Sequence, residues 1–156
     1  MPSVNLPLFN NSAIIQALVL PSVPRLEELT RQGLPPPPPQ HVNLLVDSGA
    51  SGTCIDATFL QRLNLNPTSK VPVLTPSTNG VPFYVDCYDV QLLVFHNNIL
   101  DGTQTVQTPI LNHHQSLRVT GNSMAGQGID GLLGMDVLKH CLFTINGKVN
   151  SFSLWW

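Results

Sequence analysis

The stretch LLVDSGAS, residues 44–51, decides how the rest of this sequence is interpreted. Its apolar start leads the carboxylate of Asp47 directly into a turn of small residues. A carboxylate at the end of a buried strand is costly unless it is paired, hydrogen-bonded or partly neutralised. Ser48 places a hydroxyl beside the acid, and Gly49 lets the backbone turn tightly with its amide facing inward. The stretch therefore predicts a buried strand that ends in a functional acid.

Two further patterns lie downstream of this acid. Asn79-Gly80 separates two β-rich segments, residues 71–74 and 81–85, and predicts a hairpin. Further along, the stretch GLLGMDVL predicts a strand that enters Gly134 and is followed by a short helix over residues 136–141. The acid is thus expected to lie among short β elements rather than in a helical protein.

The remaining segments predict an all-β protein. Short strands are expected at residues 12–20, 41–46, 53–55, 88–95, 105–111, 129–133, 142–145 and 149–154, and short helices at residues 25–32 and 57–63. Residues 1–11 predict an irregular arm, and the polar, Gly-rich residues 112–128 predict a long loop. About eight to ten short strands without an internal repeat favour a barrel or sandwich, built as a single domain over residues 1–156.

A Pro-rich insertion, residues 21–40, separates the first predicted strand from the strand that delivers the acid. It contains five consecutive prolines, residues 35–39, which must be extended polyproline II and are excluded from a sheet interior. A stiff spacer between two strands is the simpler interpretation. A ligand for a proline-binding module is the alternative.

Composition limits the partners and the compartment. Only 10% of the 156 residues are charged, the net charge is −2, and no basic cluster occurs, which argues against nucleic acid as a partner. Neither a run of membrane-spanning length nor the charged start of a signal peptide is found, so no membrane association is expected. Three cysteines without metal-like spacing predict reduced thiols. We therefore expect a cytoplasmic protein.

Three patterns together resemble those of one enzyme family. The turn Asp47-Ser48-Gly49-Ala50, the hairpin at residues 75–81 and the later Leu132-Leu133-Gly134 are similar to the active-site turn, the flap and the hydrophobic-hydrophobic-Gly motif of retropepsin-like aspartic proteases. The four-residue turn alone arises often by chance, whereas all three patterns in this order are specific. The resemblance extends over residues 42–145.

The sequence also departs from the retroviral members of this family. The insertion at residues 21–40 replaces a short turn, and Ser51 and Gly52 replace acids with which the viral enzymes grip the substrate backbone. In these respects the chain is more similar to stand-alone bacterial members.

The resemblance implies an aspartic endopeptidase that cleaves extended polypeptides. In such enzymes two carboxylates share a proton, so that one activates a water while the other polarises the scissile carbonyl. A single Asp-Ser-Gly turn supplies only one carboxylate, which implies a homodimer with Asp47 of each subunit at the two-fold axis and no metal or organic cofactor. By resemblance, Ser48 bonds to the partner's loop and Gly49 keeps the carboxylates coplanar. Ala50 lacks a hydroxyl that would favour the ionised pair, so we expect a mildly acidic to near-neutral optimum.

The resemblance also implies where the substrate binds. The flap would close over an extended peptide and donate backbone hydrogen bonds, with Gly80 as its hinge. Apolar walls around the cut imply a preference for apolar or aromatic side chains. The substrate-binding residues implied in this way are Leu45, Ala50, Cys54, Thr75, Ser77, Thr78, Gly80, Asp130 and Leu132.

Other chemistries are less well supported. Asp136 is interpreted as a cap of the helix that it opens, and Asp130 lacks the Ser/Thr-Gly partner of a catalytic acid. The pair His113-His114 lacks neighbouring ligands for a metal. Ser123 lies in an incomplete nucleophile elbow, which disfavours a serine hydrolase. The main alternative is an inactive dimerisation or peptide-binding domain of the same fold.

The chain ends on Trp155-Trp156, an apolar end that needs to be covered. The resemblance implies that the terminal strands of two subunits interleave over it.

Overall fold

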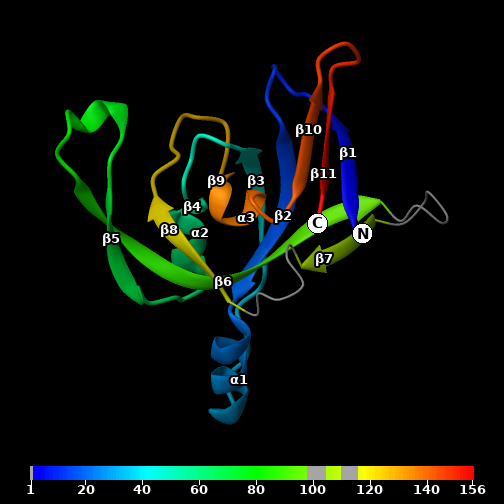
Figure 1. Cartoon of the computed structure of the whole chain (residues 1–156). Coiled ribbons are helices and arrows are strands. Elements are labelled where there is room, and N and C mark those ends of the chain that lie inside the picture. Colours follow the sequence, from blue (N-terminus) through cyan, green and yellow to red (C-terminus); the bar gives the residue numbers. More distant parts are fainter. Residues whose placement is uncertain (1, 98–104, 110–115) are drawn as a thin grey trace.

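The computed structural model describes residues 2–97, 105–109 and 116–156. This part of the chain forms a β-barrel, a smaller sheet beside it and short helices (Figure 1). The strands are β1 (Ser3–Pro7), β2 (Ile14–Pro21), β3 (Gln40–Val46), β4 (Cys54–Asp56), β5 (Ser69–Val73), β6 (Phe83–Asn97), β7 (Thr105–Pro109), β8 (Leu117–Asn122), β9 (Gly131–Leu133), β10 (Leu142–Asn146) and β11 (Ser151–Trp155). The helices are α1 (Val23–Arg31), α2 (Ala57–Arg62), α3 (Met135–Leu138) and the 3₁₀ turn η1 (Pro76–Thr78).

The barrel contains six strands in the described residues, in the order β2-β3-β9-β4-β8-β6, and the pairing of β6 with β2 closes it. The β3–β9 and β4–β8 pairs are parallel, and the other pairs are antiparallel. Along β3, the buried Val42, Leu44 and Val46 alternate with more exposed residues, as expected for a strand with one face in a core. The predicted all-β fold is therefore confirmed, and it is a closed barrel.

A second sheet, in the order β1-β11-β10, packs beside the barrel. The predicted irregular arm over residues 1–11 is wrong, because β1 pairs with β11 and Val4 is only 4% exposed. The Trp156 side chain is 8% exposed, and its amide donates to the Pro2 carbonyl. Trp156 is thus covered within one chain, whereas Trp155 is 38% exposed.

The predicted long loop over residues 112–128 is also partly wrong. Residues 117–122 form β8, which lies between β4 and β6 in the barrel. Buried Leu117 and Val119 flank exposed Arg118, but the following Thr120 and Gly121 conceal this short alternation in the sequence. His113 and His114 lie outside the described residues, as do residues 110 and 111 of the strand predicted over residues 105–111.

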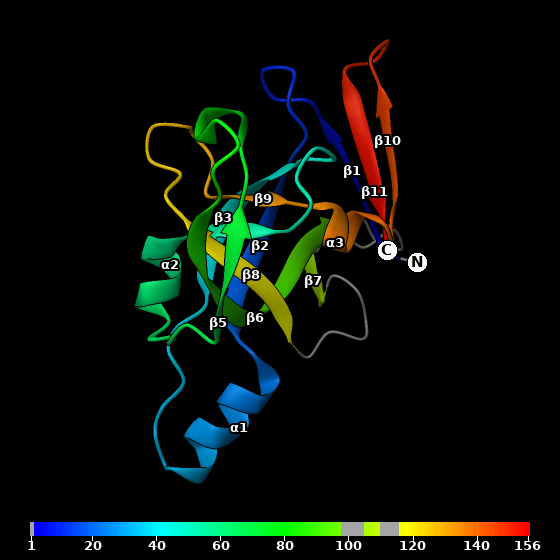
Figure 2. The ribbon, with the colours of Figure 1, turned by 60° about the vertical axis from the view of Figure 1, so that its left-hand side comes forward.

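An arm projects from the barrel at the end opposite the β5–β6 hairpin (Figures 1 and 2). It consists of α1 and the five prolines that lead back to β3, so the predicted insertion is structured at its start by a helix. Within the described ranges, no helix is long and apolar enough to cross a membrane.

Candidate active site

Asp47 lies at the point where β3 leaves the barrel. Its amide donates to the Leu133 carbonyl at 3.0 Å, and the preceding Val46 amide donates to Ala13 at 2.9 Å. The Gly49 amide donates to Asp47 Oδ1 at 2.8 Å, and the Ala50 amide donates to the Asp47 carbonyl at 3.2 Å. The turn therefore closes around the carboxylate, as the small residues after Asp47 predict.

Thr53 and Asp136 connect the end of the Asp47 loop to α3 through side-chain hydrogen bonds. Asp136 Oδ1 accepts from Thr53 Oγ1 at 2.7 Å, and Oδ2 accepts from the Thr53 amide at 2.9 Å. Thr53 is 1% exposed, and its hydroxyl also accepts from the Gly134 amide at 3.1 Å. The capping interpretation of Asp136 is therefore wrong, because the N-cap of α3 is Gly134 and Asp136 lies in the first turn of the helix. Its carboxylate accepts from the Val137 amide at 2.9 Å but mainly connects α3 to the end of the Asp47 loop.

The glycine of the second motif is required by a close approach of two backbones. A Cβ on Gly134 would lie 2.5 Å from both the carbonyl carbon and the oxygen of Gly52. The Met135 and Asp136 amides donate to the Ala50 and Ser51 carbonyls at 2.8 and 3.2 Å. Because these contacts run from backbone to backbone, the two sequence motifs form one unit.

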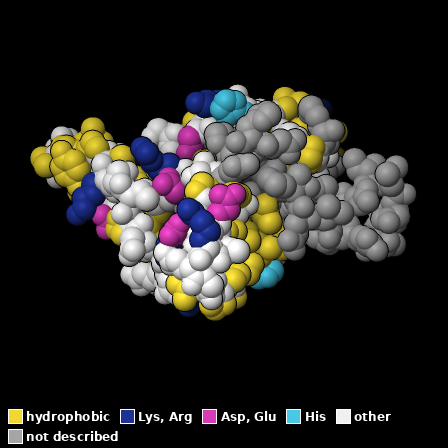
Figure 3. Space-filling model, turned by 90° about the horizontal axis from the view of Figure 1, so that it is seen from below, with side chains coloured by type: hydrophobic (Ala, Val, Ile, Leu, Met, Phe, Trp, Pro, Cys, Tyr) yellow, Lys and Arg dark blue, Asp and Glu magenta, His cyan; other side chains and the backbone are white. Residues whose placement is uncertain are grey.

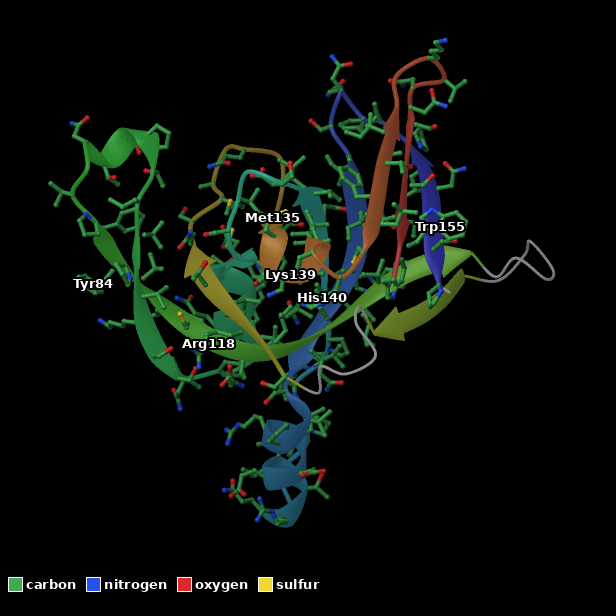
Figure 4. All side chains as sticks on the ribbon, in the orientation of Figure 1. Tyr84, Arg118, Met135, Lys139, His140 and Trp155 are labelled. Atoms are coloured by element: carbon green, nitrogen blue, oxygen red, sulfur yellow. The ribbon has the colours of Figure 1, made fainter. Side chains whose placement is uncertain are left out.

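A shallow hollow opens on the α3 side of the turn. It is lined by Ser48, Gly49, Ser51, Met135, Asp136 and Lys139. Met135 is 38% exposed, and Figure 4 shows Met135 on α3 near Lys139 and His140, which follow the helix. The apolar side chain of Met135 and the amine of Lys139 are thus exposed next to the predicted catalytic turn.

The predicted subsite walls lie side by side on three strands. Leu45 on β3 is in register with Leu132 on β9, which is in register with Cys54 on β4. Leu45 and Leu132 are half-buried and alternate with residues of the core, whereas Cys54 is 3% exposed. Burial raises the pKa of the Cys54 thiol to about 11, so it is a neutral apolar group at ordinary pH.

Asp130 is fixed by β3 rather than free. Its Oδ2 accepts from the Asn43 amide at 2.8 Å, and its own amide donates to the Asn43 carbonyl at 2.8 Å. In the part of the chain that the structure describes, neither Asp130 nor Asp136 is hydrogen-bonded to Asp47.

The predicted flap is a hairpin of β5 and β6 with a structured tip. Thr75 and Thr78 form a capping box around η1, and Thr75 Oγ1 lies 2.8 Å from Ser77 Oγ. The side chains predicted to contact substrate here thus bond to one another. Gly80, at φ +79°, has open space around it, as the hinge prediction requires.

Asp56 was missed by the sequence analysis. It is the N-cap of α2, where its Oδ1 accepts from the Thr58 amide and hydroxyl at 2.9 and 2.6 Å. Its Oδ2 accepts from the Met124 amide at 2.7 Å, which connects α2 to the loop between β8 and β9. Bonds from Thr58 and Met124 lower the pKa of Asp56. An acid directly before a helical pattern predicts the cap, but nothing local predicts the Met124 bond.

Comparisons with known proteins agree with this geometry. No curated protein matches the chain significantly. The crystal structure of a retropepsin-like aspartic protease from Rickettsia conorii matches it with a TM-score of 0.52 at 13% identity, over 97% of this chain and 89% of that one, which shows a shared fold. The family model for aspartyl protease matches residues 38–137, which contain the Asp47 turn, the hairpin and Gly134. The chain therefore belongs to the aspartyl protease family and has a retropepsin-like fold.

Proposed function

We propose that this protein is an endopeptidase in which two copies of the chain each supply Asp47 to a catalytic pair. The observation that carries the proposal is the Asp47 turn, where the Gly49 amide bonds to one carboxylate oxygen and the strand end is fixed by Leu133. A pair of carboxylates is needed because one must be ionised to activate water while the other is protonated. The two nearest motif acids, Asp130 and Asp136, are already bonded to backbone or Thr53.

Exposed apolar groups support the second copy, and one of them, Met135, lines the hollow beside the Asp47 turn. Met135 is 38%, Trp155 38% and Leu142 57% exposed, and Leu142 and Trp155 are paired across β10 and β11. Closed two-fold assembly brings the same surface of both copies together, so a patch beside Asp47 also brings the two Asp47 turns together. Ser48, which lines the hollow beside Met135, would then bond to the partner's turn.

The substrate would be an extended peptide bound between the flap and the Asp47 turn. Val71 and Val73 on β5 are in register with Val85 and Phe83 on β6, so one face of the flap is apolar. Leu45 and Leu132 are the apolar subsite walls that the family resemblance implies. This supports a preference for apolar or aromatic side chains at the cut. The three free cysteines support a reducing compartment such as the cytoplasm.

The test is cleavage of a diverse peptide library from about pH 4 to pH 8 by the wild type, by Asp47→Asn and by Glu27→Gln. Glu27 is an exposed acid on α1, away from the Asp47 turn, and serves as the matched control. We expect cleavage by the wild type and Glu27→Gln but not by Asp47→Asn. Equal cleavage by all three would show that Asp47 is not the catalyst.

Sedimentation of the same samples tests whether two copies of the chain form a dimer. Activity should rise with the square of concentration where monomer predominates, and mixing in excess Asp47→Asn should inhibit the wild type by forming mixed dimers. A dimer without turnover on any peptide would favour the binding-domain alternative. An active monomer at all concentrations would contradict the shared pair.

A further inference from the structure

The arm formed by α1 and residues 32–39 has a surface that the proposed peptidase activity does not use. The α1 helix leads away from the barrel, the chain reverses at Gly33 with φ +67°, and the prolines return to β3. The Leu34 amide donates to the Leu29 carbonyl at 2.9 Å, and Gln40 Nε2 donates to the Pro38 carbonyl at 2.9 Å, so both ends of the run are fixed to the protein.

The exposure of the prolines follows the period of polyproline II. This helix has three residues per turn, so residues three apart lie on one edge. Pro37 is half-buried, while Pro35, Pro36, Pro38 and Pro39 are exposed. The edge of Pro37 therefore packs against the domain, and the two other edges, each with two prolines, are exposed along the groove that the run forms with α1 and α2. Proline-recognition grooves contact two edges of such a helix and leave the third free.

Basic side chains lie next to the run. Arg25 on α1 and Arg62 on α2 line the same groove as Pro35–Pro38, and neither forms an ion pair with an acidic side chain within the described residues. Arg62 lies over the Phe59 ring at 5.3 Å, which orients its guanidinium. Figure 3, which views the molecule from the side of the arm, shows basic, acidic and apolar side chains together there. A partner with acidic groups beside an apolar groove would complement this surface.

The arm is also remote from the Asp47 turn. The seven residues of β3 separate the last proline from Asp47, a span of roughly 23 Å at about 3.3 Å per residue. A partner bound to the arm would leave the Asp47 turn and the flap accessible.

We propose that residues 34–39 dock into an SH3-type module, whose aromatic groove binds the two outward edges and whose acidic rim pairs with Arg25 and Arg62. Polyproline II is already formed in the free protein, so binding orders little additional backbone. Docking of this kind would recruit the protein to a partner without occupying its Asp47 site.

The test measures binding of the full chain to a panel of purified SH3 domains, with WW domains as a second panel. Each SH3 domain is also used with its groove tryptophan replaced by alanine. We expect binding to intact SH3 domains that weakens at high salt, because the arginine pairs are exposed. Pro36→Ala should weaken it by about tenfold or more, whereas Pro37→Ala, on the inward edge, should change it by less than about threefold.

The charge contribution is tested with Arg25→Gln/Arg62→Gln, which should weaken binding and flatten its salt dependence, against Lys148→Gln as an exposed control on the other sheet. Far-UV circular dichroism and the melting temperature confirm that each variant is folded. Asp47→Asn should bind like the wild type, which separates this proposal from the proposed activity. The proposal is overturned if no SH3 domain binds better than its groove variant, if only WW domains bind, or if Pro36→Ala has no effect.

Discussion

The Asp47 turn and the tip of the flap are both loops between strands, but they are stabilised in different ways. The Asp47 turn bonds to residues far away in the sequence, such as Leu133 and Asp136. The flap tip bonds mainly within residues 75–81, and Leu74 and Val81 are 65% and 69% exposed. A site that must hold a carboxylate in place is thus built from nonlocal backbone contacts. The hairpin tip, which we propose opens and closes over a peptide, is built from local ones.

The two regions should differ most in how much stability is lost when a glycine is replaced by alanine. Gly134→Ala places a Cβ 2.5 Å from the Gly52 backbone, which is unable to move without displacing the Asp47 loop, so we expect a loss above about 3 kcal/mol or no folded protein. Gly80→Ala in the flap has open space and only the strain of φ +79°, for a loss of about 1 kcal/mol. Urea unfolding measures both. Equal losses of stability for Gly134→Ala and Gly80→Ala would show that the backbones of Gly134 and Gly52 are not in rigid contact.

A smaller difference in the free energy of unfolding is expected between variants of Thr53 and Thr78. Thr53→Val leaves the buried Gly134 amide without its acceptor and removes one of the two bonds to Asp136 Oδ1, for an expected loss of about 2 kcal/mol and a lower kcat. Thr53→Ser keeps the hydroxyl and serves as the control. Thr78→Val removes bonds at the flap tip, where water replaces them, and should cost less than about 1 kcal/mol. A larger effect at Thr78 than at Thr53 would reverse the comparison.

Asp56 combines local and distant bonds, because it caps α2 and also accepts from the Met124 amide in the loop after β8. Asp56→Ala should lower the free energy of unfolding by about 1 kcal/mol, and Asp56→Asn should lower it less because an amide oxygen also caps. The pKa of Asp56 is lowered on folding, so its contribution is fully present above the unfolded value of 3.8 and is lost as pH falls through the lower folded value. Urea unfolding at acidic pH should therefore show wild type and Asp56→Asn converging. A gap that widens with acidification would contradict this sign.

The smallest difference is expected in the rates at which Cys54 and Cys141 are labelled by a thiol reagent. Cys54 lies next to the Asp47 unit and Cys141 follows α3, and burial raises the pKa of each thiol to about 11. Iodoacetamide reacts with thiolate, so labelling near neutral pH should be slow at Cys141 and undetectable at Cys54 until the protein is unfolded. Mass spectrometry of peptides gives the labelled fraction at each position. Rapid labelling of Cys54 in the native protein would indicate that the strands around the turn open readily.

Much of the fold was predictable because its determinants are local. Residues 44–51 indicated a strand and a tight turn, Asn79-Gly80 indicated the flap hairpin, and the strands predicted at residues 142–145 and 149–154 correspond to β10 and β11. The α2 helix also lies within its predicted range, with Asp56 as its cap. In each case the preference of a few adjacent residues for a turn or a cap is sufficient.

What failed was decided by partners distant in the sequence. Pro- and Asn-rich residues 1–11 have weak strand preference, and β1 forms because β11 offers an edge and a buried position for Val4. The polar β8 is a strand because β4 and β6 pair with both its edges.

The sequence by itself determined that Asp47 ends a strand in a glycine turn, because small residues after an apolar run permit little else. Only the tertiary structure decided that Asp136 bonds to Thr53, that Trp156 is buried within the chain while Trp155 is exposed, and that one edge of the prolines faces inward. Those outcomes depend on which distant backbone groups meet, and hydrogen bonds and burial between distant segments leave no mark on the local pattern of residues.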